Sequence, residues 1–458
     1  MRRFKSLLKR LLVVGLALLA SLAVAWAASR AMYPTAAQRD AIDRMEQKPE
    51  FPGENAFALL WTLEHDVPED ELSAVMAEDV RRFAETAGSS KTGSLRRVES
   101  AAENYPDLSP GDHDRRQFCF PIDESCLPRV RENLDAYIDL IERNARLLDR
   151  IEGLHEYQHL RSEFPTELSH LLPPFRTTTL LRTARAVAFA SGREEEAVAA
   201  TCRDIATWRR LGAQSGTMTT RSVAIAYASG YGRALANMLA EWPIERPLPT
   251  RCDQALAAPR AMDLSICSSM RGEFALSAHS TRNLGKPGRE GRFIDSALEL
   301  LFFDAEATVG MLAQALAEHC SEEEQERILA DQPPAAESTR PGLLRFVCVG
   351  NFVGCLAQKI AKPIALPFRS HLRDYGAKLR VLATLAWMRG HAEEGLSPSK
   401  LLSERPSELK SPSRDIEFGP EGNTLRVPLY ASSVEDYWSI ALPPELHVLP
   451  SSDRRQER

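Results

Sequence analysis

An uninterrupted apolar stretch near the N-terminus is the strongest hydrophobic pattern in the chain. Residues 11–29 contain no charge, five basic residues precede them, and Arg30 follows them. The stretch is longer than the roughly 7 to 15 residues of a signal-peptide core and close to the ~20 residues that cross hydrocarbon. Because a basic flank stays in the cytoplasm, the sequence predicts a transmembrane anchor within residues 1–30 and a following chain that lies outside the cytoplasm.

A cleaved signal peptide is the alternative interpretation of the same segment. Ala25-Trp26-Ala27 has the small-x-small pattern that signal peptidases accept. Cleavage there would leave a mature N-terminus near Ala28 and a soluble periplasmic protein. Without cleavage, the chain would be a single-pass protein of the bacterial inner membrane, with its N-terminus in the cytoplasm and its bulk in the periplasm.

Most of the remaining chain follows the spacing of helices. Within residues 130–160, an apolar stripe at i, i+4 and i+7 predicts one long helix with a buried face. The stripe consists of Leu134, Ile138, Ile141, Ala145 and Leu148. A second helix is predicted over 219–242, where small residues recur every four positions and let a neighbouring helix approach closely. These small residues are Ala224, Ala228, Gly232 and Ala236.

A second apolar run, over residues 343–356, has a different character from the N-terminal one. Arg345 and Asn351 interrupt it, and Lys359 and Lys362 follow it. The run is therefore too short and too polar to span a bilayer. The sequence predicts that it forms a buried helix of the core.

The pattern changes near the C-terminus, where short runs (IEF, TLRVPLY and DYWSIAL) follow one another and GPEGN separates the first two. Two or three strands are expected there. The predicted fold class is thus mainly α, with an N-terminal transmembrane helix, a multi-helix periplasmic domain and a small C-terminal antiparallel β element. The expected segments are the anchor (1–30), a helical N-terminal segment (31–130), a helical core region (131–330), a helical C-terminal region (331–410), a β-hairpin or meander (411–447) and a disordered tail (448–458).

Composition adds a constraint on partners. The 458 residues are 44% apolar and 26% charged, which is ordinary for globular proteins and excludes wholesale disorder and a polytopic membrane protein. The formal charge of −6 is an average, because the first 30 residues hold six basic residues and no acid, so the rest carries −12. Such an acidic region disfavours nucleic acid and anionic lipid as partners. It favours an envelope protein, or a neutral or basic ligand.

Eight cysteines fit export to an oxidising compartment, where they can pair. Cys119 and Cys126 enclose Pro121, which disfavours helix and lets the ends of the segment meet, so a disulfide is predicted between them. Cys252 and Cys267 flank a proline-containing turn and form a second candidate pair. Cys348 and Cys355 have the spacing of the first pair, but on one helix they would lie about 10 Å apart along the axis and could not bond.

One sequence motif has catalytic potential. His155-Glu156-Tyr157-Gln158-His159 matches H-E-x-x-H, in which two histidines on one helix face bind zinc and the glutamate deprotonates the metal-bound water. The surroundings argue against a zinc site, because Pro165 would end the helix and no third ligand lies at either usual spacing. We therefore expect no cofactor and interpret the histidines as structural. Zinc bound by His155 and His159, with Glu156 as catalytic base, is the alternative.

Four short stretches resemble uncharacterised, membrane-anchored envelope proteins of Gram-negative bacteria. They are 55–68 (NAFALLWTLEHDVP), 203–211 (RDIATWRRL), 270–274 (MRGEF) and 411–416 (SPSRDI). The resemblance implies a membrane-anchored envelope protein and supplies no activity or catalytic residue. Together, the patterns predict a single-span envelope protein whose helical ectodomain is a non-catalytic interaction or structural component. The alternatives are a zinc-dependent hydrolase and a secreted periplasmic binding module.

Overall fold

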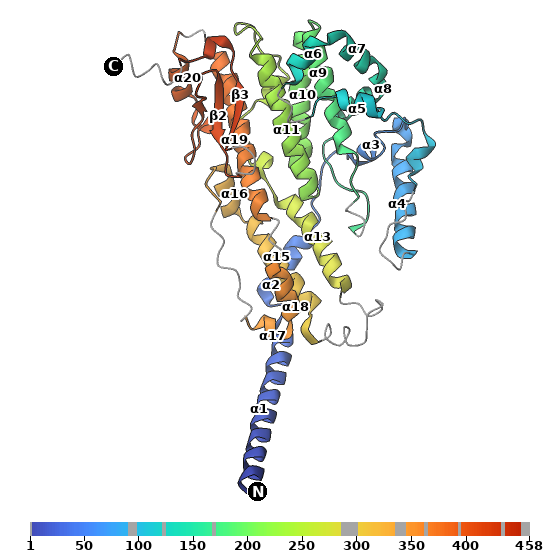
Figure 1. Cartoon of the computed structure of the whole chain (residues 1–458), viewed down its shortest axis with the longest axis vertical. Coiled ribbons are helices and arrows are strands. Elements are labelled where there is room, and N and C mark those ends of the chain that lie inside the picture. The colour runs from blue at the N-terminus through green and yellow to red at the C-terminus, as the bar shows by residue number, and fades with distance from the viewer. Residues whose placement is uncertain are drawn as a thin grey trace, which may run out of the picture. The chain divides into compact units, whose positions relative to one another are not determined.

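The computed structural model describes residues 2–89, 99–120, 125–166, 171–284, 301–334, 345–360, 365–392, 395–431 and 436–449. Helices dominate these ranges, and a small antiparallel sheet lies near the C-terminus (Figure 1), as the sequence predicts. The predicted disordered tail falls almost entirely outside these ranges.

The chain divides into two compact units. Unit 1 comprises Met1–Lys48, Met270–Ser321 and Ala335–Leu366, and unit 2 comprises Pro49–Ser269, Glu322–Pro334 and Pro367–Arg458.

The apolar N-terminal helix belongs to unit 1. The helical elements of this unit are α1 (Arg2–Met32), α2 (Ala36–Glu46), most of α13 (Cys267–Leu284), α15 (Ala305–Ala317), the 3-10 helix η7 (Glu318–Cys320), α17 (Val347–Gly350) and α18 (Phe352–Ile360). Residues Lys9–Met32 of α1 are long and apolar enough to cross a membrane. The large apolar side chains from Leu11 to Val24 are all more than half exposed. The C-terminal end of α1 instead packs along α17 (Figure 1).

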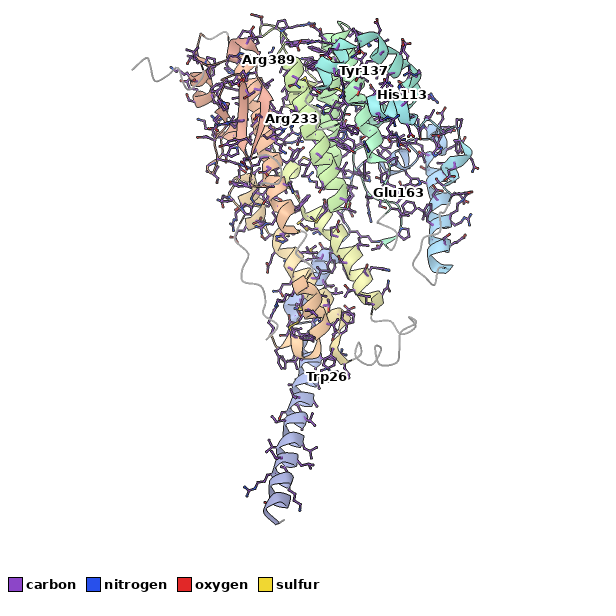
Figure 2. The ribbon with its side chains drawn as sticks, in the orientation of Figure 1. Trp26, His113, Tyr137, Glu163, Arg233 and Arg389 are labelled. Atoms are coloured by element: carbon purple, nitrogen blue, oxygen red, sulfur yellow. A yellow bond between two sulfur atoms is a disulfide. The ribbon has the colours of Figure 1, made fainter. Side chains whose placement is uncertain are left out.

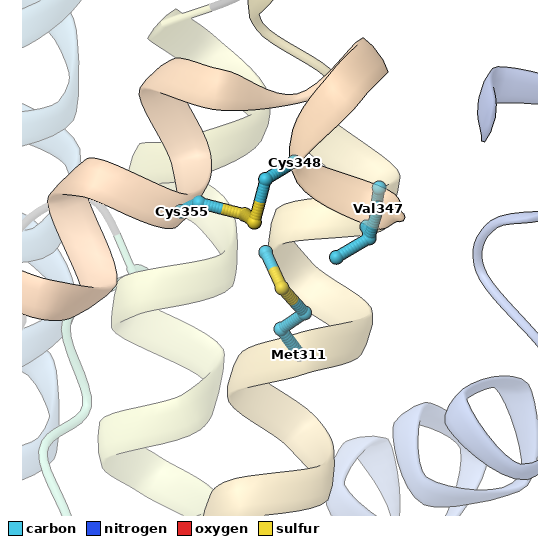
Figure 3. Packing of buried hydrophobic residues seen from close by; sticks show 5 residues of the cluster. Met311, Val347, Cys348 and Cys355 are labelled. Atoms are coloured by element: carbon cyan, nitrogen blue, oxygen red, sulfur yellow. A yellow bond between two sulfur atoms is a disulfide. The ribbon is translucent and has the colours of Figure 1, made fainter. Parts of the chain in front are cut away.

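The core of unit 1 forms where α15 meets α17 and α18. Its buried side chains belong to Ala307, Met311, Val347, Cys348 and Cys355 (Figure 3), and Tyr33 packs against them. The single buried helix predicted over this apolar run is wrong, because the chain breaks at Asn351 into two short helices. The buried Asn351 amide explains the break. Its Oδ1 accepts from the Asp304 amide at 2.9 Å, and its Nδ2 donates to Thr308 Oγ1 at 2.8 Å.

Unit 2 is built around three successive helices, α9 (Leu181–Ala190), α10 (Glu194–Ala213) and α11 (Met218–Leu239). Gly192 has a φ of +82° and ends the first helix in the left-handed region that glycine tolerates. The predicted small-residue seam packs as expected. A Cβ on Gly212 would lie 2.7 Å from the Cβ of Ala224, and one on Gly232 would lie 2.6 Å from Leu382 Cδ1.

Shorter elements surround these helices in unit 2. Before them lie α3 (Phe57–Trp61), η1 (Glu69–Glu71), α4 (Leu72–Ser89), η2 (Ala101–Asn104), α5 (Asp112–Gln117), α6 (Cys126–Glu132), α7 (Leu134–Arg143), α8 (Ala145–Glu152), η3 (Gly153–Glu156) and η5 (Phe175–Leu180). After them lie α12 (Cys252–Ala255), η6 (Ala261–Leu264), α16 (Glu322–Leu329), nearly all of α19 (Ala365–Gly390), α20 (Pro398–Glu404), η9 (Ser407–Leu409) and η10 (Pro444–Leu446). The one long helix predicted over 130–160 is therefore wrong, because Asn133 and Asn144 leave the helical conformation.

The sheet of unit 2 has the order β1-β2-β3, with β1 (Glu417–Phe418), β2 (Thr424–Pro428) and β3 (Tyr437–Ala441) all antiparallel. Leu425 pairs with Ile440, and Val427 with Trp438. All four of these side chains are buried. Because they alternate with less buried residues, one face of the sheet is apolar, and β3 lies against α11 (Figure 1).

Candidate functional site

The H-E-x-x-H segment does not form a helix in the structure. Helix α8 ends at Glu152, the 3-10 helix η3 ends at Glu156, and Tyr157 is extended. His159 and Leu160 then form parallel β-bridges to Asn55 and Ser215. The zinc hypothesis requires both histidines on one face of a helix. The two histidines do not have this arrangement.

Figure 2 draws the side chains on the ribbon of the whole chain. Among them, His155 lies in a network of charged side chains. The His155 Nε2 donates to Asp204 Oδ1 at 2.8 Å, and Arg185 Nε donates to Asp204 Oδ2 at 2.9 Å. Arg185 also bonds Glu152 at 2.5 Å, and Glu152 receives Arg203 at 2.7 Å. The side chains of His155 and Asp204 are 9% and 2% exposed. Helices α8, α9 and α10 are thus joined by one chain of ion pairs.

The electrostatics of this network favour the ionised form of Asp204. Burial opposes its ionisation, but the Arg185 charge and the hydrogen bonds from His155 and Arg185 outweigh burial and lower the pKa of this carboxyl. Burial likewise opposes the charge of Arg185, and Asp204 and Glu152 together raise the pKa of its guanidinium. Each buried charge therefore has a partner, which is the condition for such a network to stabilise a fold.

The His155–Asp204 contact resembles that of a catalytic dyad, in which a carboxylate orients the histidine ring and fixes its tautomer. A dyad needs a nucleophile beside the free ring nitrogen. Within the described ranges, no serine, threonine or cysteine hydrogen-bonds to the His155 side chain. Arg185 shares the same carboxylate, so the arrangement resembles a structural ion pair more closely than an acid-base centre.

His159 and Glu156 lie in different surroundings from His155. The ring of His159 stacks on Phe51 with centroids 5.3 Å apart, and burial lowers the pKa of this histidine. Its main-chain carbonyl accepts from the Ala56 amide at 2.9 Å. Glu156 is exposed. Across the described residues, no group of three or more His, Cys, Asp or Glu side chains is arranged to hold a metal ion.

The structure forms disulfides at all eight cysteines. Cys119 and Cys126 are bonded as predicted, with Cα atoms 5.7 Å apart. The predicted pairing of Cys252 with Cys267 is wrong, because Cys252 bonds Cys202 of α10 with a Cα separation of 4.9 Å. This pairing joins residues 50 positions apart, which spacing along the chain does not reveal.

The expectation that Cys348 and Cys355 are too far apart is also wrong. They are bonded with a Cα separation of 5.7 Å (Figure 3). The expectation assumed one continuous helix, and the break at Asn351 folds the two cysteines toward each other. With every cysteine oxidised, no thiol remains as a nucleophile or metal ligand.

A cavity that the sequence did not indicate lies beside the Cys119–Cys126 disulfide. Its volume is about 230 Å³, and its walls include Glu64, Arg115, Phe120 and Arg176. The Arg176 guanidinium lies 4.5 Å from the centre of the Phe120 ring, and Thr177 donates to Glu64. Ligand sites typically measure roughly 300–1,000 Å³, so this cavity is smaller than a usual small-molecule site. Its walls come from three separate parts of the chain, so no local motif marks it.

Two of the stretches that carry the sequence resemblance, 203–211 and 411–416, supply buried polar contacts. Asp204 is the carboxylate that pairs with His155 and Arg185. Arg209 pairs with Asp263 at 2.9 Å and donates to the Ala255 carbonyl at 2.8 Å. Arg414 pairs with Asp331 at 2.7 Å and with Asp374 at 2.6 Å.

Comparisons with protein-family models, curated proteins and solved structures find no match for this chain.

Proposed function

We propose that this chain is a single-span envelope protein whose N-terminus lies in the cytoplasm and whose helical ectodomain lies in the periplasm. The observation that carries the proposal is α1, which leaves its apolar side chains from Leu11 to Val24 exposed. Exposing so many large apolar groups to water is unfavourable in free energy. A bilayer covers these groups and removes that cost. The basic residues before Leu11 set the orientation.

The cysteines support the placement of the ectodomain. All eight are disulfide-bonded, and disulfides persist in the periplasm while the cytosol keeps thiols reduced. The acidic composition of the ectodomain, with a formal charge of −12, favours a protein as its partner over nucleic acid.

We further propose that the ectodomain acts without catalysis, as an interaction or structural component. The strongest candidates for chemistry, His155 and Asp204, pair with each other, and Asp204 also pairs with Arg185. Groups held in this way orient one another and contribute to the rigidity of the helices that they join.

Topology can be tested on the full chain expressed in a Gram-negative host. The protein is expected to stay in the membrane after an alkaline wash, to begin at Met1 on N-terminal sequencing, and to be digested by protease added to spheroplasts. A mature N-terminus near Ala28 would instead support a soluble periplasmic protein. Protection of the ectodomain in spheroplasts would contradict the orientation.

The non-catalytic role can be tested with Glu156→Gln, which changes the exposed residue that a zinc hydrolase would require as its base. We expect this variant to restore the envelope integrity of a deletion strain as fully as the unchanged protein does. Purified protein should hold zinc far below one ion per chain, with no change in His155→Ala. Stoichiometric zinc that His155→Ala removes, or failure of Glu156→Gln at normal abundance, would overturn the proposal.

A further inference from the structure

An exposed apolar surface lies on the short helices α17 and α18. It is formed by Phe346, Val349, Phe352, Val353 and Leu356, which we call the apolar patch. These side chains are between 36% and 45% exposed. The sequence predicts them to be buried, but the break at Asn351 turns only Val347, Cys348 and Cys355 into the core. Five large apolar side chains on two adjoining short helices are more than scattered surface residues.

The patch lies directly beside the end of α1. Ser29 Oγ donates to the Phe346 carbonyl at 2.9 Å and accepts from the Gly350 amide at 3.1 Å. Arg30 Nε donates to the Gly350 carbonyl at 3.4 Å. A Cβ on Gly350 would lie 2.9 Å from the Arg30 side chain, so glycine allows this close approach. The position of the patch relative to α1 is therefore fixed by direct contacts.

The length of α1 sets the depth of these contacts. Arg10 and Arg30 are separated by about 30 Å along a helix axis, and the hydrocarbon core of a bilayer is also about 30 Å thick. The two arginines would then lie at opposite faces of the membrane. Trp26, whose ring lies 5.0 Å from the Arg30 guanidinium, occupies the position of an interfacial aromatic residue. Because Ser29 and Arg30 contact the patch, the patch lies at the same depth as Trp26, at the membrane interface.

The patch is also held in a fixed shape. The Cys348–Cys355 disulfide joins α17 to α18, and the buried Asn351 ties the turn between them to α15. Gly354 lies so close to α15 that a Cβ there would be 2.1 Å from Thr308 Oγ1. A surface ordered in advance loses little conformational entropy when it meets a second surface.

The charges around the patch differ from those of the ectodomain as a whole. Arg345 and Lys359 flank it and are exposed. The sequence has no acid between Glu337 and Asp374, although the chain after residue 30 carries a charge of −12. Apolar side chains bordered by basic ones are the combination that binds the surface of an anionic bilayer.

We propose that the apolar patch inserts into the headgroup region of the bilayer at the membrane face where α1 emerges, so that the protein contacts lipid through a second, folded element. This inference rests on the proposed membrane span. Insertion covers the five apolar side chains, and the adjacent Arg345 and Lys359 bind lipid phosphates.

Photo-crosslinking on the full chain tests the proposal. The photoreactive residue p-benzoylphenylalanine is placed at position 352 in the patch, at position 16 in the middle of α1, or at position 314. Gln314 is exposed and lies about 15 Å along α15 from its Asp304 end, so it is the matched control. Each protein is placed in nanodiscs of phosphatidylcholine alone or with phosphatidylglycerol, irradiated and analysed by mass spectrometry. Peptide mapping checks the Cys348–Cys355 disulfide.

Lipid adducts are expected at positions 16 and 352 and not at 314. The yield at position 352 is expected to rise with phosphatidylglycerol and to lose that rise in the double variant Arg345→Gln, Lys359→Gln. Lipid adducts at 16 without any at 352, or a crosslink from 352 to a second copy of the chain, would overturn this inference and leave the membrane span intact. Absence of lipid adducts at position 16 would overturn the span itself.

Discussion

A buried carboxylate shows how much of this fold depends on single residues. Asp204 accepts from His155 and Arg185, and its side chain is 2% exposed. Replacing it by Asn keeps the shape but leaves the Arg185 charge with Glu152 alone. We expect Asp204→Asn to lower the free energy of unfolding by about 3 kcal/mol, as measured by urea denaturation of the full chain in detergent with tryptophan fluorescence.

The matched control for this variant lies on the same helix. Glu196 is exposed and pairs with Arg193 at 3.4 Å, so Glu196→Gln should change stability by less than about 0.5 kcal/mol. Equal effects of the two substitutions would contradict the role given to the His155 network.

We expect His159 to make the stability of the fold sensitive to mild acid. Burial lowers the pKa of its ring in the folded protein, so the unfolded chain binds the proton first as the pH falls. The stability contributed by neutral His159 is complete above about pH 6.5 and is lost below it, with a slope of at most about 1.4 kcal/mol per pH unit.

Urea denaturation at pH 7 and pH 5 measures this contribution. We expect His159→Phe, which keeps a ring against Phe51, to lose less stability than the unchanged protein between the two pH values. His113→Gln is the control, because the His113 side chain is 78% exposed. An unchanged difference in His159→Phe would show that the ring is not held neutral by burial.

At the scale of elements, close helix contacts depend on glycine. A Cβ on Gly354 of α18 would lie 2.1 Å from Thr308 Oγ1, whereas a Cβ on Gly390 of α19 would meet nothing within 4 Å. Gly354→Ala should therefore destabilise by about 1–3 kcal/mol through overpacking. Gly390→Ala should be neutral or stabilising by up to about 1 kcal/mol, since alanine favours helix. Thermal unfolding of the two variants side by side measures the difference, and equal midpoints would contradict the contact.

The elements also show what the sequence could and could not predict. The apolar N-terminal helix, the small-residue seam of α11 and the C-terminal sheet follow from local sequence patterns, so they could be predicted. The breaks at Asn144 and Asn351 could not, because the partners that favour them are distant. Asn144 Nδ2 donates to Asp114, 30 residues away, and Asn351 bonds Asp304, 47 residues away. The break at Asn351 also explains why the Cys348–Cys355 bond was not predicted, whereas the end of α8 at Glu152 explains why the two histidines of the motif do not share a helix.

At the scale of the whole molecule, disulfides stabilise to different extents. The Cys202–Cys252 bond spans 50 residues and the Cys119–Cys126 bond spans seven. Loop-closure entropy predicts losses of about 4 and about 2.5 kcal/mol when both cysteines of each pair are replaced by serine. Urea denaturation of the two double variants tests this order, and a larger loss for the short loop would contradict it.

The segmented composition of unit 1 has a consequence for biosynthesis. The unit begins with Met1–Lys48 but is completed by Ala335–Leu366. At about 5–20 residues per second, roughly 15–65 s separate the synthesis of α1 from that of its packing partner α17. During this interval α1 exists without the helix against which its C-terminal end packs. On the topology proposed above, α1 would therefore enter the bilayer long before it acquires its final contacts with α17.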